Sequence, residues 1–167
     1  MRRVNFLNSK ESKEIAKQIN EQWDADFSFE DFVVRSTKDK VYTIDRDLEK
    51  IDFRNYNIEQ FGLYVAHIND RNEIRLSIEG SQIIGPKAKK NVIEIGSLVK
   101  LWMAGQDIPF KTDCTGVVIV KHKGDYLGCG KVVTREVSVF DEEGNTKKEM
   151  QQTILNFVPK TRRHVKD

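Results

Sequence analysis

The sequence predicts an α+β protein, with an α+β domain over residues 1–90 and a small mixed β-barrel over residues 91–167. Three observations lead to this prediction. The first half opens with one amphipathic helical pattern, followed by segments in which apolar and polar residues alternate. The second half is a series of short apolar segments separated by turn signals, with one short helical stretch. Gly85-Pro86 and the lysines after it mark the boundary between the two halves.

The first helix is expected over residues 9–23. Asn8 or Ser9 can cap its start, and Glu11 stands three residues after Asn8, as the acceptor of a capping box does. Apolar residues recur at every fourth position and share one face: Ile15, Ile19 and Trp23. This pattern predicts that the helix packs on the rest of the first domain through that face.

An antiparallel sheet is expected to follow the helix. Its strands are predicted at residues 32–35, 41–44, 61–68 and 73–79, with a helical turn at 47–51. The last strand is predicted from the strict alternation of Ile74, Leu76 and Ile78 with polar residues. A short helix is expected to begin at Ser81 and to break at Gly85.

The second half is predicted to be mostly strand. We expect strands at residues 92–95, 116–121, 126–134, 136–140 and 152–158. A short helix is expected at 97–103, ended by Gly105, and the acidic stretch 141–145 is expected to form a hairpin loop. Many short strands with a single helix favour a small closed barrel.

Three motifs of the second half occur in an order that is similar to a known RNA-binding domain. Ala104-Gly105-Gln106-Asp107-Ile108 follows the short helix, Gly124 to Lys131 ends in a G-x-G hairpin, and Ile154 to Arg163 closes the chain. Read together, residues 92–158 resemble a PUA domain. The closing segment is similar to the PUA-like tail of bacterial and archaeal RNA 5-methylcytosine methyltransferases.

The whole chain also resembles the Nip-seven-type ribosome-biogenesis proteins, which carry an α+β pre-PUA domain before a PUA domain. The segments that carry this likeness are Phe61–Tyr64, Ile74–Gly80 and Pro86–Lys89. The acidic loop and the tail after Pro159 are longer than that family leads us to expect. The resemblance implies RNA binding through the turn after the first PUA helix, with Gly105, Gln106 and Asp107 reading a base or ribose edge.

The distribution of charge agrees with a nucleic-acid partner. The net charge is only +2, yet residues 86–135 hold nine lysines and arginines against four acids. With the turn, the expected RNA-binding residues are Lys100, Gly105, Gln106, Asp107, Lys121, Lys123, Lys131, Arg135, Lys160, Arg162 and Arg163. The alternative interpretation is a set of solvated lysines on an ordinary surface, with Gly105 serving only to end a helix.

Signals for other classes of protein are weak. There is no G-x-G-x-x-G after a strand and no P-loop, and Cys114 has no partnered base nearby. The two cysteines lack zinc-ligand spacing and are expected to be free thiols or buried apolar groups. Asp45, Asp47 and Glu49 are interpreted as a charged helix start rather than a metal site. We therefore expect no catalytic residues, cofactor or metal, and, without an export signal or membrane span, a cytoplasmic location.

The sequence thus predicts a non-catalytic RNA-binding protein that acts in rRNA maturation or RNA modification. Its partners would be structured RNA (rRNA or tRNA) and a methyltransferase or pre-ribosomal protein. Three alternatives stay open. They are a stand-alone RNA-binding subunit of an RNA methyltransferase, a PUA-like enzyme with a small-ligand cleft, and a protein–protein adaptor.

Overall fold

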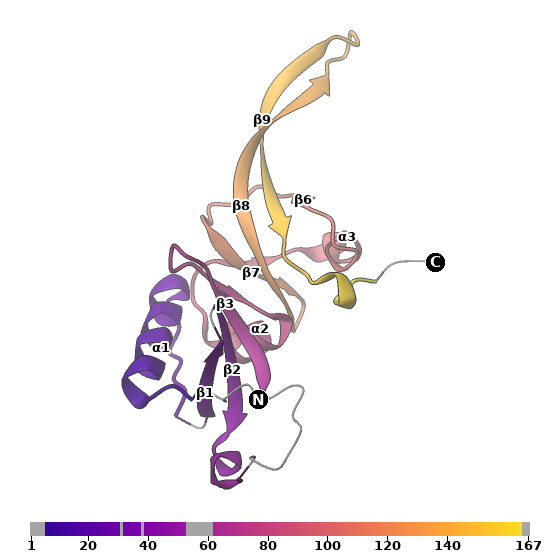
Figure 1. The fold of residues 1–167 in the computed structure, drawn as a ribbon. Coiled ribbons are helices and arrows are strands. Elements are labelled where there is room, and N and C mark those ends of the chain that lie inside the picture. The colour runs from indigo at the N-terminus through magenta and orange to yellow at the C-terminus, as the bar shows by residue number, and fades with distance from the viewer. Residues whose placement is uncertain (1–5, 31, 38, 53–61, 165–167) are drawn as a thin grey trace.

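The protein has an α+β fold with two sheets (Figure 1), in a computed structural model that describes residues 6–30, 32–37, 39–52 and 62–164. The first sheet is antiparallel with strand order β1-β2-β3-β4. The second is mixed, with order β5-β7-β8-β9-β6 and with β5 parallel to β7. The predicted α+β class is confirmed.

The elements have the following bounds. The helices are α1 (Ser9–Trp23), α2 (Ile78–Ile84) and α3 (Val99–Met103), with 3₁₀ segments η1 (Arg46–Lys50), η2 (Gly85–Lys87), η3 (Gly96–Leu98) and η4 (Lys160–Arg162). The strands of the first sheet are β1 (Phe32–Thr37), β2 (Lys40–Asp45), β3 (Leu63–Ile68) and β4 (Ile74–Leu76). Those of the second are β5 (Val92–Glu94), β6 (Ile108–Pro109), β7 (Val117–His122), β8 (Asp125–Phe140) and β9 (Thr146–Asn156).

Helix α1 forms as its sequence predicts. The Asn8 side chain accepts from the backbone N–H of Lys10 at 2.9 Å and of Glu11 at 3.0 Å, and the Glu11 carboxylate accepts from the Asn8 N–H at 2.8 Å. This reciprocal pair is a capping box. Ile19 and Trp23 are buried in the core. No helix in the described ranges is long and apolar enough to cross a membrane.

The chain after Leu76 departs from the predicted strand over 73–79. Strand β4 ends at Leu76, and Ser77 caps α2. The Ser77 hydroxyl accepts from the Gly80 N–H at 2.9 Å and donates to the Tyr64 carbonyl at 2.6 Å. The helix therefore starts because one side chain satisfies both its first turn and the neighbouring strand, which outweighs the alternating pattern.

The two strands predicted at 126–134 and 136–140 are one strand. Strand β8 pairs with β9 without interruption from Gly130 opposite Asn156 to Phe140 opposite Thr146. Strand β9 accordingly begins at Thr146, well before the predicted start at residue 152. The two-residue strand β6 was not predicted, because within the described part of the chain it pairs with Thr153–Ile154 of distant β9 alone.

The second sheet is open. Strands β5 and β6 are its two edges, and the described residues give no pairing between them. The segment that joins them, η3 and α3, brings Trp102 into the core, where the indole N–H donates to the Leu127 carbonyl at 3.0 Å. The expected closed barrel is therefore corrected to an open five-stranded sheet that packs around α3.

One hydrophobic cluster joins the two sheets. It contains Trp23 and Val65 from the first half together with Val117, Ile119 and Cys129 from the second. A second cluster lies within the second sheet, around Trp102, Ile108, Val118 and Ile154. The sheets separate on either side of residue 90, but the core is continuous across that position. The division into two domains stays a prediction.

Gly80 offers a test of the packing between α2 and the first sheet. A Cβ atom at Gly80 would collide with the backbone carbonyl of Val65, whereas one at Gly124 would meet nothing within 4 Å. We expect Gly80→Ala to lower the free energy of unfolding by about 1–3 kcal/mol, measured by urea denaturation. Gly124→Ala should change it by less than about 0.5 kcal/mol. Equal effects of both substitutions would contradict the close approach.

Candidate nucleic-acid interface

The predicted glycine turn and the predicted basic tail lie against each other, beside α3 and η4 (Figure 1). Gly105 has φ 82°, and the Arg163 side chain lies over it so closely that a Cβ atom would collide with the guanidinium. The Arg163 Nε–H donates to the Val158 carbonyl at 3.0 Å. The His164 N–H donates to the Met103 carbonyl at 2.8 Å. The tail is thus folded back onto the end of α3.

Asn156 holds this junction together. Its side-chain NH₂ donates to the carbonyls of Trp102 at 2.8 Å and Gln106 at 3.0 Å, and its backbone N–H donates to the Asp107 carboxylate at 2.8 Å. Asn156 is not among the residues predicted from the sequence to form the site. Its position does indicate a structural role, because it is the one polar residue in the apolar run Ile154-Leu155-Asn156-Phe157-Val158, where a buried polar group needs hydrogen-bond partners.

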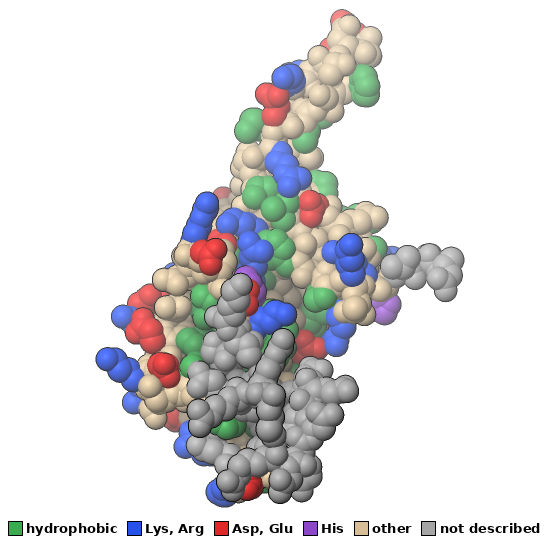
Figure 2. Space-filling model, viewed as in Figure 1, with side chains coloured by type: hydrophobic (Ala, Val, Ile, Leu, Met, Phe, Trp, Pro, Cys, Tyr) green, Lys and Arg blue, Asp and Glu red, His purple; other side chains and the backbone are tan. Residues whose placement is uncertain are grey.

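Cations outnumber carboxylates at this junction. The Asp107 carboxylate lies 3.6 Å from the Arg135 guanidinium, and Glu79 of α2 lies 2.7 Å from that of Arg162. Lys100 and Lys160 are exposed and make no ion pair within the described part of the chain. Figure 2 shows blue Lys and Arg side chains over α3 and at the base of the long β8–β9 hairpin. The members are Lys100, Arg135, Lys160, Arg162 and Arg163 against Glu79 and Asp107.

We call this surface the basic junction. It comprises the turn Gly105–Asp107, the tail Lys160–Arg163, Lys100 and Arg135. Eight of the eleven residues predicted to bind RNA belong to it. The remaining three are Lys121 of β7, Lys123 of the β7–β8 turn and Lys131 of β8.

Lys121 lies near the end of β7, and Lys123 lies in the turn between β7 and β8. The Lys121 ammonium lies 5.6 Å from the centre of the Tyr126 ring. The Lys123 N–H donates to the Glu94 carboxylate at 3.1 Å, and the His122 ring nitrogen lies 3.5 Å from the same carboxylate. Glu94 therefore offsets part of the positive charge of this turn.

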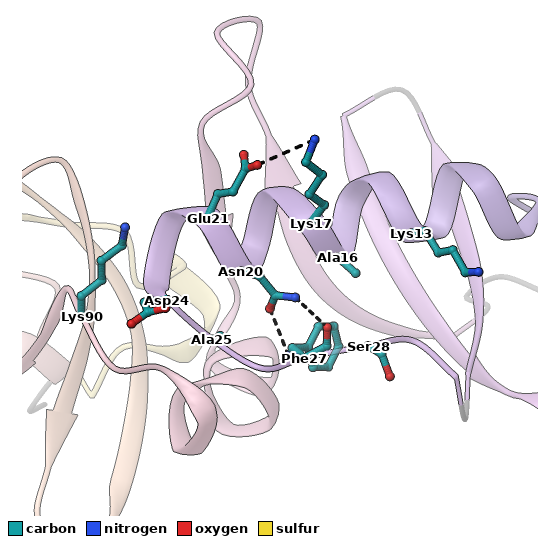
Figure 3. Close-up of a pocket in the computed structure, with 10 residues that line it drawn as sticks. All are labelled: Lys13, Ala16, Lys17, Asn20, Glu21, Asp24, Ala25, Phe27, Ser28 and Lys90. Carbon is teal, nitrogen blue, oxygen red and sulfur yellow. Dashed lines mark hydrogen bonds and ion pairs between the residues drawn. The ribbon is translucent and has the colours of Figure 1, made fainter.

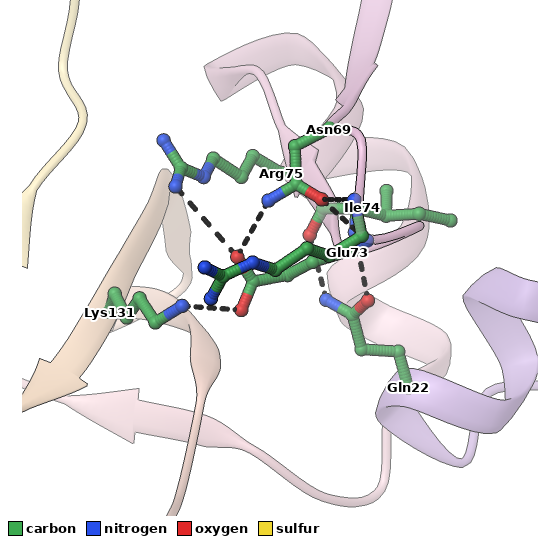
Figure 4. Close-up of polar contacts among 7 residues, drawn as sticks. Gln22, Asn69, Glu73, Ile74, Arg75 and Lys131 are labelled. Atoms are coloured by element: carbon green, nitrogen blue, oxygen red, sulfur yellow. Dashed lines mark hydrogen bonds and ion pairs between the residues drawn. The ribbon is translucent and has the colours of Figure 1, made fainter.

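Lys131 links the two sheets (Figure 4). Its ammonium donates to the Glu73 carboxylate at 2.7 Å, and the Asn69 side chain donates to the other oxygen at 3.0 Å. Arg75 lies 3.8 Å from Glu73 and stacks 4.0 Å from the centre of the Phe157 ring. Lys131 is thus engaged in a contact between the halves of the molecule.

Burial and charge act in opposite directions on Glu73. Burial alone raises the pKa of its carboxyl, but the hydrogen bond and charge of Lys131, with Arg75 and Asn69, bring the pKa below its ordinary value.

On the other side of Asn69 and Glu73, Gln22 of α1 bonds the backbone of Ile74 twice, at 2.7 and 3.0 Å (Figure 4). These contacts fix α1, β4 and β8 to one another.

An open hollow lies along α1 (Figure 3), with a volume of about 700 Å³. Some of its polar side chains engage one another or the backbone. Lys17 pairs with Glu21 at 3.8 Å, and the Asn20 side chain bonds the backbone N–H and C=O of Phe27, both at 3.0 Å. The hollow is lined by α1, the segment after it and Lys90, none of which belongs to the basic junction.

The remaining chemically active side chains are dispersed. Within the described ranges, no three His, Cys, Asp or Glu side chains form a group that could hold a metal ion. Asp45 caps η1 by accepting from the Asp47 N–H at 2.8 Å, as expected of a charged helix start. Cys114 and Cys129 are free thiols, as predicted. Burial raises the pKa of the Cys129 thiol to about 12, so it packs as a neutral group.

No family model matches the chain, and no curated protein matches it closely enough to count as a relative. The resemblance to PUA-domain proteins therefore stays a prediction.

Replacing Glu73 with Gln should destabilise the protein in a pH-dependent way. Because the pKa of Glu73 is lowered in the folded state from its ordinary 4.5, its stabilisation is present above that value and is lost as the pH falls through the lowered pKa. We expect Glu73→Gln to cost about 1–2 kcal/mol at pH 7 and progressively less below about pH 4. The measurement is urea denaturation across this pH range.

Glu149→Gln is the matched control for Glu73→Gln. Glu149 pairs with Lys147 at 3.1 Å on an exposed hairpin, where such pairs contribute little. A constant difference between wild type and Glu73→Gln at every pH would contradict the proposed role of the ion pair.

Gly105→Ala should release the tail from the turn. The new methyl group would collide with Arg163, and we expect faster hydrogen exchange of the His164 amide, which bonds Met103. Gly144→Ala is the control, because Gly144 has φ 83° but nothing within 4 Å of a Cβ. It carries the same backbone strain without the Arg163 contact. Equal exchange of the C-terminal peptide in both variants, measured by mass spectrometry, would count against the contact.

Proposed function

We propose that this protein is a non-catalytic RNA-binding protein of pre-PUA and PUA architecture that acts in rRNA maturation or RNA modification. The observation that carries the proposal is the basic junction. A backbone turn and a basic tail that are far apart in the sequence lie in direct contact, with Arg163 over Gly105.

The arrangement of groups suits a structured RNA. The exposed ammonium groups of Lys100 and Lys160 supply the sequence-independent attraction to phosphates. The Arg163 guanidinium uses its Nε–H for Val158 and has further donors in a planar fork that matches a phosphate. Gln106, which is exposed on the turn, offers an amide for a base or ribose edge. The junction thus combines contacts that would position the RNA backbone with contacts that would read a base or ribose edge.

Binding is favoured over catalysis by the state of Asp107. It is the one carboxylate of the turn, and its oxygens already accept from the Asn156 N–H and face Arg135. A carboxylate with both oxygens engaged in this way orders the turn. The side chain that could act on a substrate therefore serves the shape of the binding surface.

Removal of the two unpaired lysines tests the proposal. Lys100→Ala combined with Lys160→Ala should weaken binding to a transfer RNA mixture or a ribosomal RNA hairpin by about tenfold at low salt. The slope of log affinity against log salt should fall by about two, one for each lost phosphate contact. Fluorescence anisotropy over a series of salt concentrations gives both quantities.

Lys10→Ala combined with Lys13→Ala is the matched control. It removes the same charge from the exposed face of α1, away from the junction, and should leave both quantities near wild type. Equal losses in the two double variants would indicate non-specific attraction. Absence of binding by wild type at low salt would overturn the proposed function. Where RNA binding is found, copurification with a methyltransferase or with pre-ribosomal particles would identify the process that the protein serves.

A further inference from the structure

The β8–β9 hairpin projects from the body as an arm (Figure 1). We define the arm as residues 135–151. Strand β7 follows β8 only to Lys131, and β6 pairs with β9 only at Thr153 and Ile154. Over the arm, β8 and β9 therefore pair only with each other within the described part of the chain. An isolated two-stranded ribbon is marginally stable in water.

Both edges of the arm present unpaired backbone groups. The last outward contacts at its base are the Val132 N–H to the Gly116 carbonyl at 2.9 Å and the Phe110 N–H to the Gln152 carbonyl at 3.1 Å. Outward-pointing groups recur at every second residue of a strand. On β8 they therefore belong to Glu136, Ser138 and Phe140, and on β9 to Thr146, Lys148 and Met150. Free edges of this kind are templates for strand addition.

Apolar side chains are also exposed along the arm, as Figure 2 shows in green. Phe140 is 78% exposed and Met150 is 68% exposed. Val137 and Val139 lie on the opposite face of β8 from Phe140 and are half-exposed. A strand added to the β8 edge would cover part of this apolar surface.

The charges along the arm favour a protein over a nucleic acid. The tip carries Asp141, Glu142 and Glu143, and no lysine or arginine. The lysines further down are engaged, Lys147 with Glu149 at 3.1 Å and Lys148 with Glu136 at 2.8 Å. A polyanion would be repelled from the tip.

We propose that the arm is a dimerisation element in which the β8 edges of two copies of this chain pair antiparallel about a two-fold axis at Ser138. The product is a four-stranded sheet in the order β9-β8-β8-β9. The partner is a second copy because the sequence of this edge is complementary to itself. A two-fold axis places the residue on the axis opposite the same residue of the other copy. Residues at equal distances before and after the axis then pair with each other.

In this register the cross-strand pairs on one face of the new sheet are complementary. Val137 of one copy lies opposite Val139 of the other, so that four valines gather on one face. Arg135 lies opposite Asp141, which brings the acidic tip of each copy to the base of the other arm. Opposite charges and β-branched pairs across strands are stabilising.

The β9 edge is less suited to this pairing by the same reasoning. Its central residues are Lys147, Lys148 and Glu149, and an axis at any of them places a charge opposite its own copy. Like charges directly opposite one another destabilise strand pairing. Charged side chains of this kind protect an edge against unwanted pairing, whereas Val137, Ser138 and Val139 leave the β8 edge available.

A matched pair of cysteine variants tests the register. Directly opposite residues of a hydrogen-bonded pair have Cα atoms about 5.5 Å apart, which is within reach of a disulfide. Under mild oxidation we expect Ser138→Cys to form a covalent dimer at least tenfold faster than Lys148→Cys. Lys148 pairs with Ser138 in the β8–β9 ladder and lies on the other edge of the arm. Equal rates would overturn the register.

The oligomeric state tests the interface itself. The paired surface is small, so dimerisation should depend on concentration, with a Kd in roughly the micromolar range. Light scattering after size exclusion should show the mass rising from 19.4 kDa towards twice that value. Ser138→Pro should abolish the rise and Lys148→Pro should leave it intact, because each proline replaces an outward N–H and spares the β8–β9 ladder.

Monomeric wild type up to about 1 mM, or dimers that persist in Ser138→Pro, would overturn the proposal. So would dimers that form only when RNA is present, since the arm would then not be self-complementary. The first two outcomes do not depend on whether the basic junction binds RNA.

Discussion

The packing of β7 and β8 on the first sheet and α1 is the constraint on which the rest of the structure depends. Val117, Ile119 and Cys129 share one buried cluster with Trp23 and residues of the first sheet. Strand β8 leaves this cluster without a break and continues into the arm, so the core sets the direction in which the arm projects. The same packing brings the Lys131 ammonium to Glu73. Separating the chain at residue 90 would expose this cluster on both sides, and it is this burial that makes the two halves one structure.

Local signals in the sequence were enough to predict some elements. Helix α1 is predicted to the residue because its capping box and apolar spacing lie within the helix itself. The strand over 73–79 is wrong after Leu76, because the Ser77 cap competes locally with a correct alternation. Pairing between distant segments makes β8 a single strand, starts β9 early and creates β6. Such pairing has no signature within a window of a few residues.

The candidate interface shows the same division between local and long-range information. The turn at Gly105 and the tail at Arg163 were each recognisable from composition and resemblance, but their contact belongs to the folded chain. Counting charges along the sequence overstated the free cations. Lys131, Arg135 and Arg162 each face a carboxylate that is remote in sequence. Asn156 was not predicted as a site residue, because the groups that it bonds on α3 and in the turn after it are remote in sequence.

The two proposals share one electrostatic consequence. The acidic tip and the basic junction lie at opposite ends of the arm, about 20 Å apart for six residues of strand. This exceeds the Debye length of about 8 Å at physiological salt, so within one copy the two ends act independently. Antiparallel pairing removes this separation, because Asp141 of one copy then faces Arg135 of the other. RNA at the junction and a partner's tip therefore compete for the same cations. By thermodynamic linkage, RNA binding and dimerisation weaken each other by the same free energy.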